Sequence, residues 1–264
     1  MNASDAPIRT IALIATHGRP ALLGRTLESL GADPNPGGPL ELVVVENGEA
    51  AGVKQICDGL SLRYPIRYLY VAQPGKSNAL NFALAQSDAE LVVLFDDDVV
   101  VAPGTIAAYR EAACRHGPGH FFGGPFDADY QERPPDWLIP YLPRSATGWS
   151  LGDHEQMVSA PDFIGVNWAV FRQDVLDAGG FAPHRGPNAR FRTLGQEEEM
   201  QQRLLAAGAT GVYVPGARVS HFVPKDRCSV EWALDRRYRS YLTFQLARTR
   251  RPKHASLAGV PLWL

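Results

Sequence analysis

The sequence LVVLFDDDVVV at Leu91–Val101 places five consecutive apolar residues directly before three aspartates. An apolar run without alternation is typical of a strand buried on both faces of a sheet. We therefore expect the acidic triplet, Asp96, Asp97 and Asp98, where this strand leaves the sheet. In open parallel sheets, ligands bind beyond the carboxyl ends of the strands. The triplet is thus interpreted as part of a ligand site at the rim of the fold.

Three adjacent carboxylates repel one another at neutral pH unless water, hydrogen-bond donors or a cation offset their charge. A divalent metal site is the first hypothesis for the triplet, and a solvated acidic turn is the alternative. An EF-hand does not fit, because the apolar Val99–Val101 stand where that loop needs a glycine and oxygen ligands.

Three apolar runs before the triplet predict further strands, at Ile8–Ala15, Leu40–Val45 and Ile66–Val71. A helix with leucines at helical spacing is expected from Pro20, and another from about Asn78 to Gln86. Strands that alternate with helices indicate an α/β fold, with a mostly parallel sheet covered by helices.

Polar residues follow each of these strands, so one crevice could collect them: Thr16 with Arg19, Glu46 with Asn47, Gly75 with Lys76, and the triplet. Lys76 at a helix N-terminus is suited to phosphate, although an exposed lysine in a turn is the alternative. A dinucleotide fingerprint is not present after the first strand. A P-loop is excluded because Tyr70 stands where its first glycine is required.

The second half of the chain is less regular. A helix to about His116 leads to a long segment, Asp127–Trp149, whose aromatic residues are expected either to stack on a sugar or to pack the loop down. A strand is predicted at Phe163–Arg172. A helix opens at Gly195 with three glutamates, for which helix capping and catalysis are both considered.

The C-terminal part adds a lone histidine, His221, at the end of a predicted strand, where either a structural or a ligand role is considered. Cys228–Arg251 is helical in pattern and basic on one side, and Leu257–Leu264, with Trp263, is apolar. Peripheral contact of this tail with a membrane surface is weighed against docking on the sheet or solvation. We divide the chain into a domain at 1–222, with halves at 1–101 and 102–222, and a tail at 223–264.

The composition is that of an ordinary globular protein, with 45% hydrophobic and 20% charged residues. A net charge of −2 gives no overall attraction to nucleic acid. Three dispersed cysteines without a CxxC pair suggest a reducing cytoplasm. Neither an export signal nor a membrane-spanning run is expected, so we predict a cytoplasmic protein, with a location at the inner face of the membrane as the alternative if the tail contacts lipid.

Taken in order, these motifs resemble those of the GT-A glycosyltransferases of family 2. The resemblance runs collinearly from about Ile8 to His221. It is carried by T-x-x-R at Thr16, E-N-G at Glu46, GKSNALN at Gly75, DDD at Asp96, GVNWAVFR at Gly165, GQEEEMQQRL at Gly195, and His221.

The resemblance implies an inverting enzyme that uses a nucleotide-diphosphate sugar, commonly a UDP-sugar. Its implied nucleotide-binding residues are Thr16, Arg19, Glu46, Asn47, Lys76, Asn81, Asp96 and Asp97. It further implies that Asp98 and His221 hold a metal, and that Asn167 and Trp168 contact the acceptor or donor sugar. When the family's acidic motif is aligned by its arginine, which is Arg203 here, the resemblance implies that Glu197 is the general base. Glu198 is the alternative.

The chemistry of this reaction assigns each group a task. A carboxylate must take the proton of the attacking hydroxyl, which is a poor nucleophile at pH 7. A cation, Mg²⁺ or Mn²⁺, must stabilise the departing diphosphate. The acceptor is an unidentified saccharide, lipid-linked molecule or small molecule. Two other functions are kept as alternatives, a sugar-nucleotidyltransferase and a non-catalytic carbohydrate-binding protein.

Overall fold

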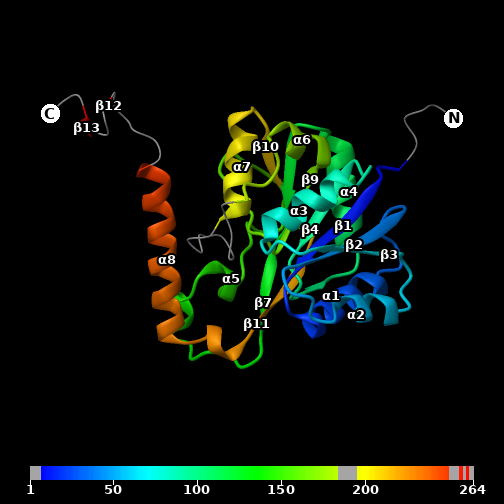
Figure 1. The fold of residues 1–264 in the computed structure, drawn as a ribbon, viewed down its shortest axis with the longest axis horizontal. Helices are drawn as coiled ribbons and strands as arrows, with labels where there is room; N and C mark the ends of the chain where they lie inside the picture. The colour runs from blue at the N-terminus through cyan, green and yellow to red at the C-terminus, as the bar shows by residue number, and fades with distance from the viewer. Residues whose placement is uncertain (1–6, 184–194, 250–255, 258–259, 262–264) are drawn as a thin grey trace.

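The computed structural model describes residues 7–183, 195–249, 256–257 and 260–261, and from residue 243 onward only the backbone. Its centre is an eight-stranded sheet with the order β3-β2-β1-β4-β9-β6-β10-β8 (Figure 1). The strands are β1 (Thr10–Thr16), β2 (Leu40–Asn47), β3 (Ile66–Val71), β4 (Leu91–Phe95), β6 (His120–Gly123), β8 (Gln156–Val158), β9 (Asn167–Phe171) and β10 (Thr210–Tyr213).

The sheet is mixed but mostly parallel, which confirms the predicted fold class. β1 pairs in parallel with both β2 and β4, and β3 continues the parallel order. β9 runs antiparallel to β4 and β6, and β8 runs antiparallel to β10. The parallel strands β1, β2 and β4 are buried on both faces, in keeping with their mostly apolar sequences.

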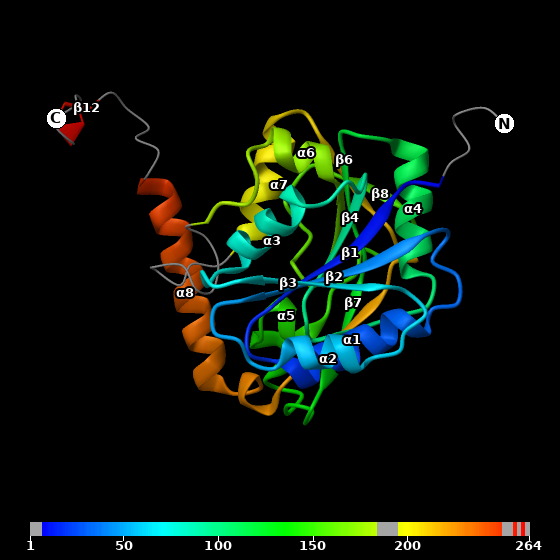
Figure 2. The same ribbon diagram turned by 45° about the vertical axis from the view of Figure 1, so that its right-hand side comes forward.

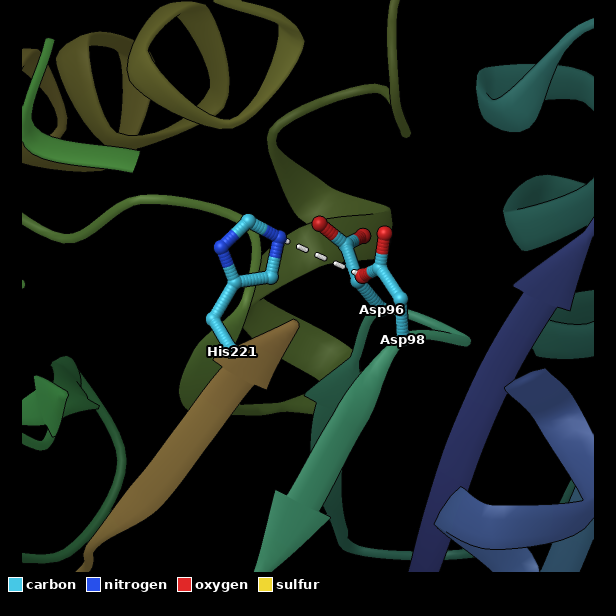
Figure 3. Close-up of side chains that lie close together, drawn as sticks. All are labelled: Asp96, Asp98 and His221. Carbon is cyan, nitrogen blue, oxygen red and sulfur yellow. Dashed lines mark ion pairs between the residues drawn. The ribbon is translucent and has the colours of Figure 1, made fainter. Parts of the chain in front are cut away.

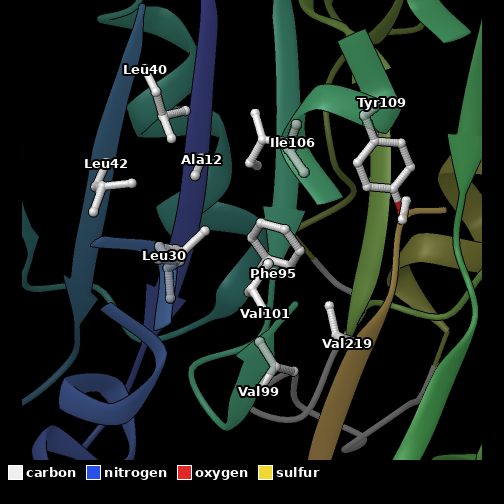
Figure 4. Packing of buried hydrophobic residues seen from close by; sticks show 14 of the residues in the cluster. Ala12, Leu30, Leu40, Leu42, Phe95, Val99, Val101, Ile106, Tyr109 and Val219 are labelled. Carbon is white, nitrogen blue, oxygen red and sulfur yellow. The ribbon is translucent and has the colours of Figure 1, made fainter. Parts of the chain in front are cut away.

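Helices cover both faces of this sheet. One core contains alternate strand residues such as Ala12, together with apolar residues of α1, α2 and α4 (Figure 4). The other contains the opposite set, such as Leu13, with residues of α3, α6 and α7. The helices are α1 (Pro20–Ala32), α2 (Val53–Gly59), α3 (Lys76–Ala85), α4 (Thr105–His116), α6 (Arg172–Asp177) and α7 (Gln196–Ala206).

A second sheet of three strands, in the order β5-β11-β7, continues from the first. It contains β5 (Val99–Val101), β7 (Phe126–Tyr130) and β11 (Val219–Val223). The apolar residues on either side of the triplet therefore belong to two sheets, and the aspartates occupy the junction between β4 and β5. The Thr26 hydroxyl fixes this junction by donating to the Val99 carbonyl at 2.7 Å and accepting from its N–H at 3.2 Å.

The segment expected to be a long loop, Asp127–Trp149, contains more regular structure than its sequence suggested. It includes most of β7, the short 3-10 helix η1 (Ile139–Tyr141) and α5 (Arg144–Thr147). Its last residue pairs with the residue just before its first, because Trp149 and Phe126 exchange backbone hydrogen bonds. Trp149 packs edge-on against Phe163 and Tyr213, which favours the packing interpretation for this aromatic residue.

A long helix, α8 (Val230–Thr249), follows the 3-10 helix η2 (Lys225–Arg227) and stands at one side of the molecule (Figure 1). Its first turns pack through Ala233 on a small core with Leu138 and Leu142. The predicted helix at Cys228–Arg251 is thus confirmed as far as Thr249, whereas Arg250, Arg251 and Trp263 lie outside the described residues.

Beyond α8, two short strands, β12 (Ser256–Leu257) and β13 (Val260–Pro261), pair in antiparallel orientation. Among the described residues, no helix combines the length and the apolar character needed to cross a membrane. The division of the chain at residues 101 and 222 stays a prediction.

Candidate active site

The acidic triplet lies at the junction of the two sheets, and its three side chains have different partners. Asp97 is completely buried, Asp98 is 5% exposed and Asp96 is partly exposed. Asp97 accepts a hydrogen bond from the Thr16 hydroxyl at 2.6 Å and one from Arg19 Nε at 3.2 Å. Arg19 also donates to Asp98 Oδ2 at 2.6 Å. The end of β1 and the start of α1 therefore bind the end of β4, as the strand order predicts.

Burial and the neighbouring charges act in opposite directions on these carboxyl groups. Burial raises the pKa of Asp97 to about 6, although Arg19 opposes the shift. Burial also acts to raise the pKa of Asp98, but the adjacent His221 imidazole and the charge of Arg19 hold that pKa well below its usual range. Asp98 is therefore an anion at neutral pH, despite its burial.

Asp96, Asp98 and His221 form a cluster whose ligand atoms all lie within 4.8 Å of one another. Figure 3 shows the three side chains pointing toward one another, His221 from β11 and the aspartates from the β4–β5 junction. His221 Nε2 lies 3.3 Å from Asp98 Oδ1. Two carboxylates and an imidazole are a donor set that suits Mn²⁺ and also accepts Mg²⁺.

Two details of the cluster fit a divalent cation. Asp98 Oδ1 is a buried oxygen that makes no hydrogen bond within the described part of the chain. His221 Nδ1 lies 2.7 Å from the Ser145 carbonyl oxygen, which can only accept, so Nδ1 carries the proton. That tautomer leaves Nε2 available as a ligand atom, and a carbonyl in this position is a common support for metal-binding histidines. The residues present therefore fit the metal.

Asp98 and His221 were predicted to form this cluster from their positions in the family motifs. Asp96 was assigned to the nucleotide, yet the structure places its carboxylate within the cluster. His221 is 4% exposed, and the charge of Asp98 raises its pKa against the opposing effect of burial.

Lys76 connects this cluster to helix α7. It is the first residue of α3, and its Nζ donates to Asp96 Oδ1 at 2.5 Å and to Glu197 Oε1 at 2.9 Å. The two carboxylates raise the pKa of Lys76 despite its burial. With a side chain that is 18% exposed, Lys76 is not a solvated lysine in a turn.

Glu197 and Glu198 occupy different environments, although they are adjacent in sequence. The Glu197 side chain is 16% exposed, and Lys76 lowers its pKa against the effect of burial. Glu198 is exposed and accepts a hydrogen bond from Gln202 of its own helix at 3.4 Å. Of the two, Glu197 is the carboxylate that faces the acidic cluster.

The position of Glu197 depends on a glycine in a neighbouring segment. A Cβ added to Gly165 would lie 2.1 Å from Glu197 Oε1 and 2.9 Å from Lys76 Nζ. The Glu197–Lys76 pair thus occupies the space that any larger residue at 165 would need. In the sequence, Gly165 appears only as the first residue of a family motif, without a predicted role.

The turn after β2 is held by two of the predicted nucleotide-binding residues. Asn47 Nδ2 donates to the Thr16 carbonyl at 2.8 Å, and Asn47 Oδ1 accepts from the Gly75 N–H at 2.9 Å. Glu46 is 1% exposed and accepts from the Ala51 N–H at 2.6 Å and from the Tyr68 hydroxyl at 2.5 Å. All four groups predicted to gather at the strand ends are therefore brought together.

Three predicted site residues are enclosed or engaged elsewhere. Asn81 exchanges hydrogen bonds at 2.8 Å with the backbone N–H and carbonyl of Phe181. Asn167 donates to the carbonyls of Pro125 and Ala217, and Trp168 is completely buried beside Phe181. Both side chains are buried among protein groups, and the contact of Asn167 and Trp168 with a sugar stays a prediction.

Two arginines near the cluster were not predicted from the sequence. Arg227 NH1 of η2 lies 4.0 Å from Asp98 Oδ2. Arg236 of α8 is partly buried, and burial and the charge of Arg227 lower its pKa while the charge of Glu197 raises it. In the sequence these arginines stand 6 and 15 residues after His221. That spacing alone does not place them near the site, because their approach depends on the turn of the chain at η2.

A family model described as glycosyl transferase family 2 matches residues 11–178, which is more than half of the chain. The succinoglycan biosynthesis protein ExoM of Rhizobium meliloti strain 1021 is 27% identical over 231 residues, covering 86% of this chain and 71% of that protein. The beta-monoglucosyldiacylglycerol synthase of Synechocystis is 31% identical over 105 residues, covering 38% of this chain and 22% of that enzyme.

Solved structures share the fold. The mannosyltransferase PcManGT from Pyrobaculum calidifontis, in complex with GDP-Man and Mn²⁺, aligns with a TM-score of 0.63 at 21% identity, covering 95% of this chain and 66% of its own. GalNAc-T7 with UDP, GalNAc and Mn²⁺ aligns with a TM-score of 0.63 at 13% identity, covering 83% of this chain and 44% of its own. The chain thus spans about two thirds of the length of the PcManGT structure and less than half of the length of the GalNAc-T7 structure.

Proposed function

This chain belongs to glycosyltransferase family 2, and from that premise we propose that it transfers a sugar from a nucleotide-diphosphate sugar to a hydroxyl acceptor with inversion. We assign the general base to Glu197. We assign binding of a divalent metal to Asp98, His221 and Asp96. The observation that carries this proposal is the continuous line of contacts from Glu197 through Lys76 to Asp96 and its cluster.

The base must be ionised and placed where an acceptor hydroxyl can reach it. Glu197 meets the first condition, because Lys76 lowers its pKa. Its partial exposure, beside the cluster expected to hold the diphosphate, supports the second. During attack, the acceptor oxygen bonds to the anomeric carbon, its proton passes to Glu197, and the bond from the anomeric carbon to the diphosphate oxygen breaks.

Lys76 has a second role in this proposal, because a diphosphate is an anion that competes for its ammonium group. In the structure Lys76 pairs with Asp96 and Glu197. A donor phosphate that draws Lys76 away weakens its hold on Glu197 and raises the basicity of that carboxylate. Binding of the donor would thereby prepare the base, at the start of a helix that already favours anions.

A divalent metal, when bound, would supply positive charge to the leaving diphosphate without any proton transfer. Asp98 and Asp96 would hold it through oxygen and His221 through Nε2. Arg19 and Arg227 stand beside Asp98, so the chain itself also brings cationic groups to this side of the site. We propose Mn²⁺ rather than Mg²⁺, because an imidazole ligand such as His221 favours Mn²⁺.

The nucleoside half of the donor is assigned to the ends of β1 and β2, where Thr16, Arg19, Asp97 and Asn47 meet. Glu46 remains the proposed reader of the base, although its carboxylate already accepts two hydrogen bonds within the protein. UDP-sugars are the first donors to test, followed by GDP-sugars. The family match favours this transferase over a nucleotidyltransferase or a carbohydrate-binding protein.

Donor and metal can be identified together by thermal shift with a panel of nucleotide-sugars, each with and without Mn²⁺. A ligand that binds only the folded state raises its stability, by about 2.7 kcal/mol at a hundredfold excess over Kd. We expect one nucleotide class to stabilise the protein, and to do so more strongly with Mn²⁺. NMR of the sugar released on slow hydrolysis should then show inverted anomeric configuration.

Retention of configuration would refute the role of Glu197 as general base in an inverting transfer. Stabilisation by nucleoside triphosphates together with pyrophosphate release would instead support the nucleotidyltransferase alternative.

A further inference from the structure

Helix α8 has two faces with different surroundings. One face packs on the body of the protein, where Ala233 is 4% exposed and Trp232 contacts the small core at the start of the helix. On the same helix, Arg237 donates to the Tyr141 carbonyl at 3.3 and 3.4 Å. These contacts fix which side of α8 is turned away from the protein.

The opposite face of α8 is an exposed stripe of large apolar and aromatic side chains. They recur at spacings of four, four, three and one residues, which places them on one side of a helix. The stripe consists of Val230, Leu234, Tyr238, Tyr241 and Leu242, with exposures of 41%, 64%, 62%, 58% and 40%. We call these five residues the α8 stripe.

Charge is distributed very unevenly between this end of the chain and the rest. After Asp235 the sequence contains seven basic residues and no aspartate or glutamate: Arg236, Arg237, Arg239, Arg248, Arg250, Arg251 and Lys253. Residues 1–235 contain the other 19 of the 26 lysines and arginines and all 28 aspartates and glutamates. Their net charge is therefore −9. An anionic surface would therefore attract the C-terminal end and repel the body.

We propose that the α8 stripe docks on the surface of an anionic phospholipid bilayer, with the helix lying in the plane of the interface. Leucine and tyrosine side chains suit the boundary between headgroups and acyl chains, and the surplus of basic residues in this end of the sequence suits anionic headgroups. The opposed charges of body and tail allow one orientation, with α8 against the membrane. This inference concerns binding and does not depend on the proposed reaction.

The orientation has a consequence for the active site. Arg227 of η2, which leads into α8, has its NH1 4.0 Å from Asp98 Oδ2, so the start of the helix lies near the site. A helix with its side chains is about 10 Å across. A bilayer bound to the stripe would therefore lie on the side of the site where η2 approaches Asp98, which suits an acceptor anchored in that bilayer.

Co-sedimentation of the full chain with vesicles tests the proposal. We expect binding to vesicles of phosphatidylglycerol mixed with phosphatidylcholine, little binding to phosphatidylcholine alone, and weaker binding at high salt, which screens the charge. The double variant Leu234→Ser/Tyr238→Ser should bind the mixed vesicles about tenfold less well, because apolar side chains that enter the interface are lost. The matched control is Met157→Ser on β8, a residue that is 57% exposed on the other side of the molecule (Figure 2).

The proposal is overturned if the chain does not sediment with the mixed vesicles, or if the double variant binds them as well as Met157→Ser does. It is also overturned if sedimentation velocity shows a dimer that the double variant abolishes, since a second copy would then cover the stripe. Should the double variant fail to fold, as judged by circular dichroism, Leu242→Ser provides the same comparison at one position.

Discussion

Replacing Gly165 with alanine should damage the reaction much more than the fold. Gly165 is not among the glycines with positive φ, so alanine suits its backbone. The added Cβ, however, would lie 2.1 Å from Glu197 Oε1 and 2.6 Å from Glu197 Cδ. Because ordinary contact begins near 3.4 Å, the carboxylate must retreat by at least about 1.3 Å.

The size of the effect follows from that displacement. A catalytic group misplaced by about 1 Å costs on the order of a hundredfold in rate. The atoms in conflict are the far end of a flexible side chain, which can swing aside, so the free energy of unfolding should fall by at most about 1 kcal/mol. We therefore expect Gly165→Ala to lower kcat about a hundredfold while the protein remains folded.

The assay is release of nucleoside diphosphate from the donor identified by thermal shift, with urea unfolding measured in parallel. Gly59→Ala is the matched control, because a Cβ at Gly59 meets no atom within 4 Å. A Gly165→Ala enzyme that keeps its kcat within about threefold would refute the reasoning, since the carboxylate would have moved without consequence. Unfolding of the variant at ambient temperature would show that the close contact between Gly165 and Glu197 is needed for folding.

Three further predictions concern the surrounding groups. Asp98→Asn should weaken Mn²⁺ binding at least about tenfold, measured by the metal-dependent shift in Tm, because it removes a charged ligand. Asn47→Ala should lower the free energy of unfolding by about 1–3 kcal/mol in urea, because the Thr16 carbonyl and the Gly75 N–H lose their partner. Asp97 has a pKa of about 6 when folded against 3.8 ordinarily, so its contribution to stability should fall as pH rises through that window. Asp97→Asn should flatten this part of the curve of unfolding free energy against pH.

The nucleotide-binding side of the fold was predictable because its signals are local. Runs of mostly apolar residues identified β1 to β4, and the break at Asp96 located the end of β4 within the chain. Parallel strands bring their carboxyl ends to one edge, so Thr16, Asn47 and the triplet had to meet. That inference needed no knowledge of side-chain contacts.

Other features depend on contacts between distant segments, which a single sequence does not contain. Val99–Val101 reads as a continuation of its strand, yet it pairs with β11 in a second sheet. Glu197 and Glu198 are equivalent in a helical pattern, and only the approach of Lys76 and Gly165 distinguishes them. The family motif at Trp168 implied a sugar contact, whereas the packing of Trp168 against Phe181 depends on a segment later in the chain.

The turnover of Glu197→Gln, measured beside Glu198→Gln, tests the central claim most directly. Because the amide cannot accept the proton, Glu197→Gln should lower kcat by about 10²- to 10⁴-fold, with donor affinity by calorimetry changed less than about tenfold. Glu198→Gln, at an exposed position, should remain close to the unaltered enzyme. Near-normal turnover by Glu197→Gln together with loss of turnover by Glu198→Gln would contradict the account.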